Sequence, residues 1–354
     1  MNPLPIRVLV VEDSQVAREL LVSLLQNSPG FEVVGTARNG REAVQLARRL
    51  KPSVITMDVY MPELDGLAAT QQIMAETPCP IVIISACSNN RELNLTFSAI
   101  QAGALTVLDK PGLDDAPEVH QAMVERIRLM SEVKVIRRWD RSGGAGKKQT
   151  SPLPGSVSVK PVEKIELIAM AASTGGPAAL VEILSRLPAD FPIPILIVQH
   201  ITPGFGSSLV TWLNQMTPLG VRLAQSAETP RPGQALIAPD DYHLEVTPLK
   251  MLKISQTPHD QNGQRPSANY LFHSVARNYG ARAMGIILTG MGNDGAEGLL
   301  AMRQQGAYTL AQNQESCVVF GMPAVAIELG AVAQILPVDK IATTMMAVTM
   351  AERS

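Results

Sequence analysis

The 354-residue chain lacks the features that mark several large classes of protein. Its three cysteines (Cys79, Cys87 and Cys317) are too few and too scattered for a disulfide framework or a zinc site. No apolar run approaches the roughly 20 residues that a membrane-spanning helix needs. A net charge of -2 leaves no basic stripe for nucleic acid, which argues against a DNA-binding output. With 46% hydrophobic and 18% charged residues, the composition is typical of a soluble globular protein with two or three domains.

The N-terminal residues 1–7 lead directly into an apolar strand pattern, without the features of a secretory signal. We therefore expect a cytoplasmic protein with no membrane insertion, and we expect it to be a monomer.

Residues 6–138 alternate short apolar runs with helical periodicity, which predicts a parallel, doubly wound sheet with helices on both faces. The predicted strands are 6–11, 31–37, 54–57, 81–85 and 106–108. A helical pattern over 118–138 closes this unit.

Carboxylates occur where two of these strands end. Glu12 and Asp13 follow the first strand, and Asp58 follows the third. The carboxyl ends of parallel strands share one edge, so these groups converge on one crevice, where an oxygen-only cluster suits Mg²⁺. Lys110 and Ser85, at two further strand ends, add a positive charge and a hydroxyl. The alternative is that these residues are ordinary solvated loop charges. That alternative explains poorly why five chemically complementary groups occur at four strand ends.

Three motifs resemble the receiver domain of bacterial response regulators. They are Val-Val-Glu-Asp-Ser at 10–14, Met-Asp-Val-Tyr-Met-Pro-Glu-Leu-Asp-Gly at 57–66 and Leu-Asp-Lys-Pro at 108–111. The resemblance implies a flavodoxin-like fold and phosphorylation of Asp58 by a histidine kinase. In this family an aromatic residue commonly stands where this chain has Val107, which puts coupling through an aromatic rotamer in doubt.

The same resemblance assigns the remaining receiver residues. It implies Mg²⁺ bound by Glu12, Asp13, Asp58 and the backbone carbonyl of Val59. It also implies that Ser85 is the switch hydroxyl and that Lys110 is the charge partner of the phosphoryl group.

A basic, glycine- and proline-rich segment, 139–163, has no apolar face and is predicted to be a flexible linker. It divides the chain into domains at 1–138 and 164–354. The second domain is also predicted to be α/β with a mostly parallel sheet. Its predicted strands are 165–170, 193–199, 235–238, 251–255, 283–289 and 307–312, with a hairpin near 243–255 and helices after residues 177, 206, 267, 295 and 321.

The second domain opens with a buried strand that breaks into Ser-Thr-Gly-Gly before Pro177 starts a helix. Ser173 therefore lies at the carboxyl end of a strand, facing a helix N-terminus that can stabilise an anion. A tight turn or an anion cradle without chemistry remains the alternative. The stretch lacks the Gly-Lys-Ser/Thr of a P-loop, the glycine spacing of a dinucleotide site and the Gly-x-Ser-x-Gly elbow.

Two other strand ends carry groups that complement Ser173. A nucleophilic serine needs a base, and the base needs a carboxylate that fixes its tautomer. His200 ends one predicted strand, and Asp294 lies in the glycine-rich loop after another. The order Ser-His-Asp differs from that of α/β-hydrolases, which agrees with the missing elbow.

A rival base is His243, beside Asp240 and Asp241. We favour His200 because it directly follows a buried strand, and Asp294 because its glycine neighbours allow close backbone approach. The other histidines, 120, 259 and 273, lie in the receiver, in a polar loop and inside a helical pattern.

Residues 165–338 resemble the chemotaxis protein-glutamate methylesterase family. The motifs that carry the resemblance are Ala-Ser-Thr-Gly-Gly at 172–176, Gln-His-Ile-Thr-Pro-Gly-Phe at 199–205, Ile-Ala-Pro at 237–239, Arg-Pro-Ser at 265–267, Leu-Phe-His-Ser-Val-Ala at 271–276, Leu-Thr-Gly-Met-Gly-Asn-Asp-Gly at 288–295, Ala-Gln-Asn at 311–313 and Ser-Cys-Val-Val-Phe-Gly-Met-Pro at 316–323. The family implies Ser173 as nucleophile, His200 as base and Asp294 as its orienting partner.

The family also implies an oxyanion hole built partly from backbone N–H groups, with Thr174 and Met291 as support. Ala171 departs from the usual glycine and could crowd the turn. Cys317 has no adjacent base, so it is interpreted as a small buried thiol.

The resemblance implies a phosphorylation-regulated esterase and amidase. It would hydrolyse glutamate methyl esters on chemoreceptors, releasing methanol, and deamidate receptor glutamines, with Mg²⁺ in the receiver and no cofactor in the esterase site. A chemotaxis histidine kinase would be the phosphodonor. The alternative from another class is a phospho-dependent binding module with a vestigial ester site. A DNA-binding regulator is less supported, since no basic recognition helix is found.

Overall fold

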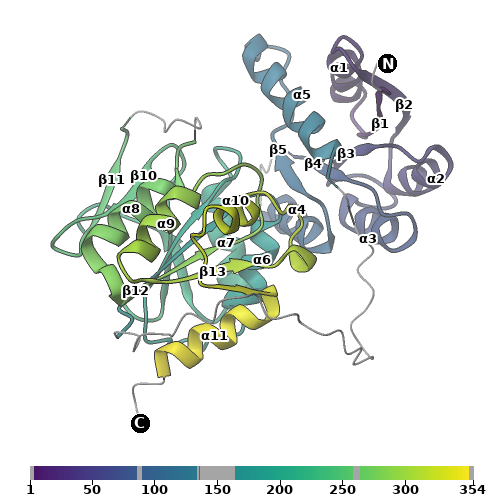
Figure 1. The fold of residues 1–354 in the computed structure, drawn as a ribbon. Coiled ribbons are helices and arrows are strands. Elements are labelled where there is room, and N and C mark those ends of the chain that lie inside the picture. The colour runs from purple at the N-terminus through teal and green to yellow at the C-terminus, as the bar shows by residue number, and fades with distance from the viewer. Residues whose placement is uncertain (1–3, 86–89, 134, 136–163, 258–263, 351–354) are drawn as a thin grey trace.

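A computed structural model describes residues 4–85, 90–133, 135, 164–257 and 264–350. Two parallel sheets, which share no strand, lie in two separate bodies (Figure 1). The predicted linker and Cys87 fall outside the described residues.

The first body is a five-stranded sheet with the order β2-β1-β3-β4-β5, and all its strand pairs are parallel. This order is that of the flavodoxin-like doubly wound fold, whose ligands bind where the order reverses, between β1 and β3. The predicted fold class is therefore confirmed for this part. The strands are β1 (Ile6–Val11), β2 (Phe31–Ala37), β3 (Val54–Asp58), β4 (Ile81–Ile84) and β5 (Thr106–Leu108).

Five helices cover both faces of this sheet. They are α1 (Gln15–Gln26), α2 (Gly40–Leu50), α3 (Gly66–Glu76), α4 (Asn90–Ala102) and α5 (Pro117–Ser131). Leu21 of α1 and Ile127 of α5 belong to the core on one face, and Ile73 of α3 and Phe97 of α4 belong to the core on the other. The helix predicted over 118–138 ends at Ser131, and residues 136–138 are outside the described part.

The second body contains a seven-stranded parallel sheet with the order β14-β13-β12-β6-β7-β9-β8 and a separate antiparallel hairpin. The sheet strands are β6 (Leu167–Ala172), β7 (Ile195–Gln199), β8 (Gly220–Leu223), β9 (Gln234–Ile237), β12 (Ala283–Ile287), β13 (Tyr308–Gln312) and β14 (Gln334–Leu336), and the hairpin consists of β10 (His243–Val246) and β11 (Leu252–Ser255). The mostly parallel sheet and the hairpin agree with prediction, with strand ends shifted by one or two residues. The two edge strands β8 and β14 were not predicted.

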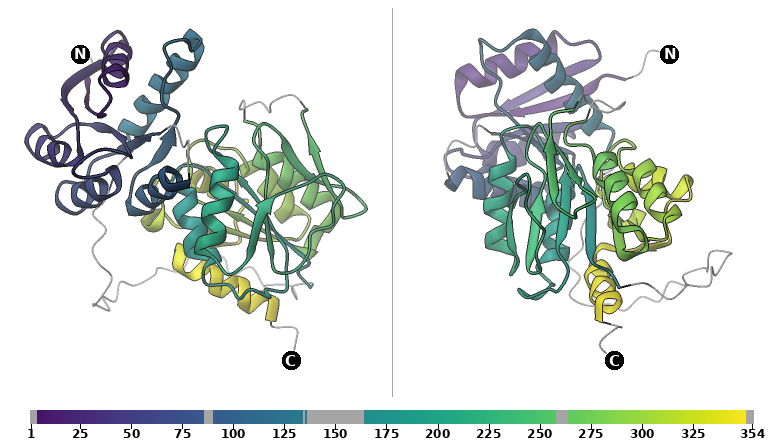
Figure 2. Two further views of the ribbon diagram at one scale, coloured as in Figure 1. Left: turned by 180° about the vertical axis from the view of Figure 1, so that it is seen from behind. Right: turned by 90° about the vertical axis from the view of Figure 1, so that its left-hand side faces the viewer.

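All five helices predicted for this domain are present: α6 (Gly176–Leu184), α7 (Gly206–Met216), α8 (Ala268–Tyr279), α9 (Ala296–Gln304) and α10 (Met322–Glu328), followed by α11 (Val338–Met350). In the right-hand view of Figure 2, α6 and α7 lie on one face of the sheet, and α8, α9 and α10 lie on the other. Helix α11 packs on α6. Pro177 stands in the first turn of α6, where its missing N–H costs no hydrogen bond.

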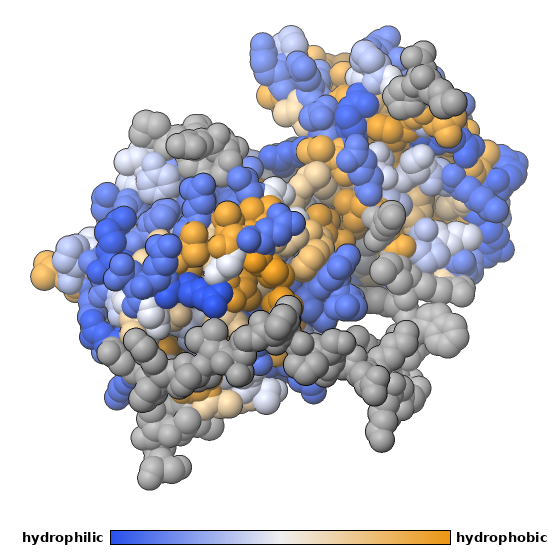
Figure 3. All heavy atoms as spheres, in the orientation of Figure 1, coloured by the Kyte–Doolittle hydropathy of each residue, from blue (hydrophilic) through white to orange (hydrophobic). Residues whose placement is uncertain are grey.

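The two bodies contact each other through α4, which packs on α6 and α7. Phe97 of α4 stacks on Trp212 of α7, with ring centroids 5.2 Å apart and an interplanar angle of 23°. Both rings are almost completely buried. In Figure 3 apolar surface (orange) extends from the region of α10 toward the first body.

Candidate active site and receiver site

The three predicted catalytic residues follow three adjacent strands of the second sheet. Ser173 follows β6, His200 follows β7, and Asp294 lies in the loop after β12. The last backbone rung of β6 and β7 pairs Ala172 with Gln199, so Ser173 and His200 are the next residues on neighbouring strands. The edge shared by parallel strands thus brings all three together, as the strand-end pattern predicted.

His200 and Asp294 are hydrogen bonded, with His200 Nε2 2.8 Å from Asp294 Oδ2. The side chains are 10% and 3% exposed, so solvent screens this contact little. Because Nε2 faces the carboxylate, Nδ1 is the imidazole nitrogen that is left for a serine. This is the reverse of the usual triad, in which the carboxylate holds Nδ1.

Asp294 is also bound to the N-terminus of α8. Its Oδ1 accepts hydrogen bonds from Ser267 Oγ (2.7 Å) and the Asn269 amide (3.0 Å), and Oδ2 accepts one from the Ala268 amide (2.6 Å). Burial alone would raise the pKa of Asp294, but the bonds from His200, Ala268 and Ser267 outweigh it and lower that pKa. The carboxylate is therefore held ionised, as an orienting partner must be.

The turn at Ser173 is held by the loop after β12. The Ser173 amide donates to the Thr289 carbonyl (3.0 Å), and Thr289 Oγ1 donates to the Thr174 carbonyl (2.9 Å). A side chain at Gly290 would place its Cβ 2.7 Å from Ser173 Cβ, so only glycine permits this approach. Met291, the next residue, is thereby brought beside the serine, where its amide is a candidate oxyanion donor.

The rival base His243 is placed elsewhere. It is fully buried, its ring stacks on Tyr270 with centroids 3.8 Å apart, and its Nδ1 accepts from the Ser267 amide (3.2 Å). Asp240 accepts from the Gly204 and Gly206 amides at the start of α7. Asp241 pairs with Arg265. These contacts give each residue a structural role.

Three supporting residues were not predicted as site residues: Gln199, Ser267 and Thr289. Each makes its contacts to the site through a side-chain amide or hydroxyl, and only their presence in the family-like motifs could have drawn attention to them. Cys317, which was expected to be a small buried thiol, is only partly buried. Desolvation nevertheless raises the pKa of its thiol to about 12, so little reactive thiolate forms near neutral pH.

The receiver residues meet at the carboxyl edge of the first sheet. Lys110 Nζ lies 2.8 Å from Asp58 Oδ2 and 3.1 Å from Glu12 Oε1. Burial, together with the charge of Asp58, raises the pKa of Glu12 to about 7. Burial also raises the pKa of Asp58, against the opposing effect of Lys110. Two buried carboxylates share one ammonium, so the site is short of positive charge.

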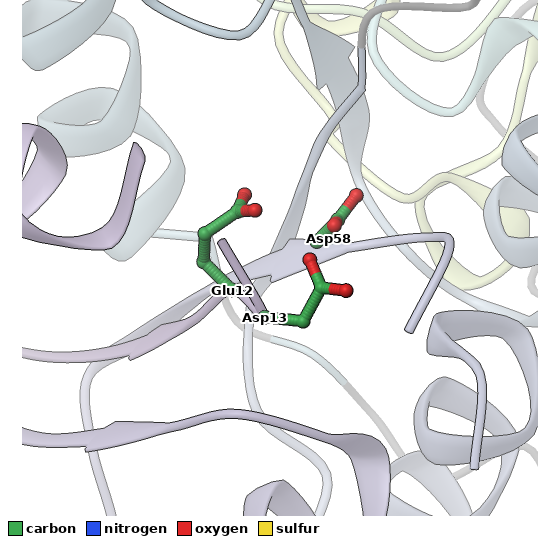
Figure 4. Close-up of side chains that lie close together, drawn as sticks. All are labelled: Glu12, Asp13 and Asp58. Carbon is green, nitrogen blue, oxygen red and sulfur yellow. The ribbon is translucent and has the colours of Figure 1, made fainter. Parts of the chain in front are cut away.

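Glu12, Asp13 and Asp58 each offer a carboxylate oxygen within 4.8 Å of the others, and Figure 4 shows the three side chains close together. Glu12 Oε2 is buried and has no hydrogen-bond partner among the described residues. An orphaned buried oxygen in an all-carboxylate cluster fits a hard divalent cation. These residues can therefore hold a metal ion.

Ser85 is connected to the domain interface through α4. It is fully buried at the end of β4, and its Oγ accepts a hydrogen bond from Thr96 Oγ1 (3.2 Å). Thr96 immediately precedes Phe97, the residue that stacks on Trp212. A movement of Ser85 toward Asp58 would therefore act on the helix that holds the two bodies together.

A second contact joins the receiver to the loop that begins with His200. Thr202 Oγ1 donates to the Val107 carbonyl (2.8 Å) and accepts from Arg126 (3.2 Å). Met291 and Val318 of the second body pack against the receiver core that includes Leu108 and Met123. The receiver thus contacts the loops that carry the candidate active site.

Two family models match separate parts of the chain. Residues 8–125 match the response regulator receiver domain model, and residues 168–345 match the CheB methylesterase model. A protein-glutamate methylesterase/protein-glutamine glutaminase of Nitrosospira multiformis is 46% identical over 96% of both chains. One from Syntrophus aciditrophicus is also 46% identical, over 96% of this chain and 97% of that protein.

Among solved structures, the CheB methylesterase catalytic domain of Thermotoga maritima matches with a TM-score of 0.50 and 34% identity, over 52% of this chain and 99% of that one. Within the described residues, no helix has the length and apolar character to cross a membrane.

The fold defines a receiver domain joined to a catalytic domain with a parallel α/β sheet. The chain belongs to the CheB methylesterase family, in its two-domain form with an N-terminal receiver.

Proposed function

We propose that this protein hydrolyses methyl esters of glutamate side chains on chemoreceptors, releasing methanol, and deamidates receptor glutamines, in the cytoplasm. The observation that carries the proposal is the buried His200–Asp294 pair, at the strand ends next to Ser173. Identity of 46% over nearly the whole length of proteins named for these two activities supports the same substrates. An ester and an amide of one carboxyl group differ only in the leaving group, so one site serves both.

Ser173 is the proposed nucleophile. Its Oγ attacks the side-chain carbonyl carbon while its proton passes to His200 Nδ1, because Nε2 is engaged by Asp294. Asp294 stabilises the imidazolium that forms. His200 then gives the proton to the departing methanol or ammonia, and an acyl ester on Ser173 remains. Water attacks this ester with His200 again as base, which releases the glutamate carboxylate and restores Ser173.

The negative oxygen of each tetrahedral intermediate needs donors fixed in advance. The Met291 and Thr174 amides are proposed for this role. Two contacts of neighbouring residues support this role: Gly290, which precedes Met291, approaches Ser173 closely, and the Thr289 hydroxyl binds the Thr174 carbonyl.

Asp58 is the proposed phosphoacceptor for a chemotaxis histidine kinase. Glu12, Asp13 and Asp58, with the Val59 carbonyl, would hold Mg²⁺, which neutralises charge at the phosphoryl group when it is bound. Lys110 lies within hydrogen-bond distance of Asp58 and would pair with a phosphoryl oxygen.

The unphosphorylated receiver is proposed to inhibit by covering the active-site loops. A phosphoryl group on Asp58 would attract Ser85, break its hydrogen bond with Thr96 and displace α4 from Trp212. This route needs no aromatic side chain at position 107, since Val107 contributes to the interface through its backbone carbonyl.

The test is methanol release from methylated receptor membranes, with and without a small phosphodonor, by wild type and Ser173→Ala. Wild type should release methanol faster with the phosphodonor, and Ser173→Ala should lose activity by orders of magnitude in both conditions. A binding-only module would release none. Wild-type rates in Ser173→Ala would refute the nucleophile.

A further inference from the structure

Gln199 stands between the two groups that must react with each other. It is the last residue of β7, 3% exposed, and its backbone pairs with Ala172 at the end of β6. One further backbone hydrogen bond lies beyond this residue pair, from the His200 amide to the Ala172 carbonyl (2.9 Å).

The side chain of Gln199 then continues the contact between the two strands. Its Nε2 donates to the Ser173 carbonyl (2.9 Å) and to the His200 carbonyl (2.8 Å). One nitrogen thus joins the backbones of the proposed nucleophile and base. Only an amide NH₂ offers two donors on one uncharged atom, whereas a hydroxyl offers one donor and a carboxylate none.

The amide is also fixed by packing. An ideal Cβ at Gly176 would lie 2.0 Å from Gln199 Oε1, so the oxygen occupies the space that a side chain at the start of α6 would take. Oε1 is buried and has no hydrogen-bond partner among the described residues. A buried acceptor without a partner lowers stability. The amide of Gln199 is therefore better explained by the two backbone carbonyls that its Nε2 binds.

We infer that Gln199 is a positioning residue that fixes the distance between Ser173 and His200 during catalysis, an inference that rests on the proposed function. Proton transfer from Oγ to Nδ1 requires hydrogen-bond distance, and a misplacement of about 1 Å can cost roughly 10²-fold in rate. The nitrogen of Gln199 restrains both backbones beyond the last rung of the sheet.

Asn278 provides a matched control. Its Nδ2 also donates to two backbone carbonyls, of Val246 and Ser274, both at 2.9 Å, but it lies in the last turn of α8, between that helix and β10. Gln199→Met and Asn278→Leu each remove two hydrogen bonds of the same kind without large change in volume. Full-length phosphorylated protein is assayed for methanol release, with kcat normalised to folded protein.

Gln199→Met should lower kcat by about 10- to 100-fold while KM changes by less than about threefold, because the substrate-binding surface is intact. Asn278→Leu should retain wild-type kcat. In proton NMR, the signal of the His200 Nε2–H held by Asp294 should broaden by faster exchange in Gln199→Met and stay sharp in Asn278→Leu.

Equal kcat and an unchanged imidazole signal in the two variants would overturn the inference. If wild type itself hydrolysed no receptor ester, the proposed function would fail. The imidazole signal would still decide whether Gln199 positions His200.

Discussion

Phe97→Ala tests how the receiver restrains the enzyme. Phe97 and Trp212 are stacked across the interface and almost completely buried. Aromatic stacking contributes about 0.5–1.5 kcal/mol beyond area burial, and losing the buried ring surface adds more. A shift of ~1–3 kcal/mol in the free energy with which the receiver docks corresponds to a change of about 5- to 150-fold in the ratio of open to closed molecules. Unphosphorylated Phe97→Ala should therefore be more active than unphosphorylated wild type.

The assay is methanol release without phosphodonor, combined with tryptophan fluorescence. The sequence has two tryptophans, Trp139 and Trp212, so Trp139→Phe leaves Trp212 as the only indole emitter. In this background the emission of Trp212 should shift to the red when the interface opens, because the indole becomes exposed to water. Leu21→Ala is the control, since Leu21 is a buried receiver residue of the core on the α1 and α5 side of the sheet. This substitution also leaves a cavity, so it should lower the free energy of unfolding of the receiver by a comparable amount, and it does not change the interface.

A red shift in Phe97→Ala without a rise in activity would show that docking does not inhibit. An equal rise in Leu21→Ala would attribute the activation to loss of receiver structure rather than to the aromatic stack.

Three further predictions concern the sites and the domains. Asp294→Asn should lower kcat by roughly 10⁴-fold, because it disfavours the required imidazole tautomer. His243→Ala should lower kcat per folded molecule much less. If His243→Ala lowered kcat more than Asp294→Asn, His243 would be the base. The pKa of Glu12, raised to about 7, means that the folded receiver holds this proton more tightly than the unfolded chain. Without metal, receiver stability should therefore fall as pH rises from about 4.5 to 7, Mg²⁺ should abolish that fall in thermal melts, and a flat metal-free profile would contradict it. A fragment beginning at residue 162 should exceed the unphosphorylated full chain in methanol release, while Asp58→Ala should stay at basal activity with phosphodonor; a fragment at or below the full chain's rate would mean that the receiver activates by its own contacts.

Much of the fold follows from local patterns. Helices begin at or beside the predicted glycine, serine and proline positions, because capping and backbone freedom act over a few residues. The buried strands were recognised by their apolar runs. The edge strands β8 and β14 were missed because they have four and three residues and are only partly buried, so their pattern is weak.

Local sequence patterns are enough to predict which chemical groups meet, because parallel strands bring their carboxyl ends to one edge whatever the details of packing. Ser173, His200 and Asp294 were predicted in this way, as were the carboxylates around Asp58. The geometry with which these groups meet depends on packing between distant parts of the chain. The choice of Nε2 as the nitrogen that faces Asp294, the stacking of His243 on Tyr270, and the packing of the receiver on α6 and α7 all depend on side-chain contacts between distant segments. Such contacts leave no periodic signal in the chain, since they depend on where whole elements pack rather than on local sequence.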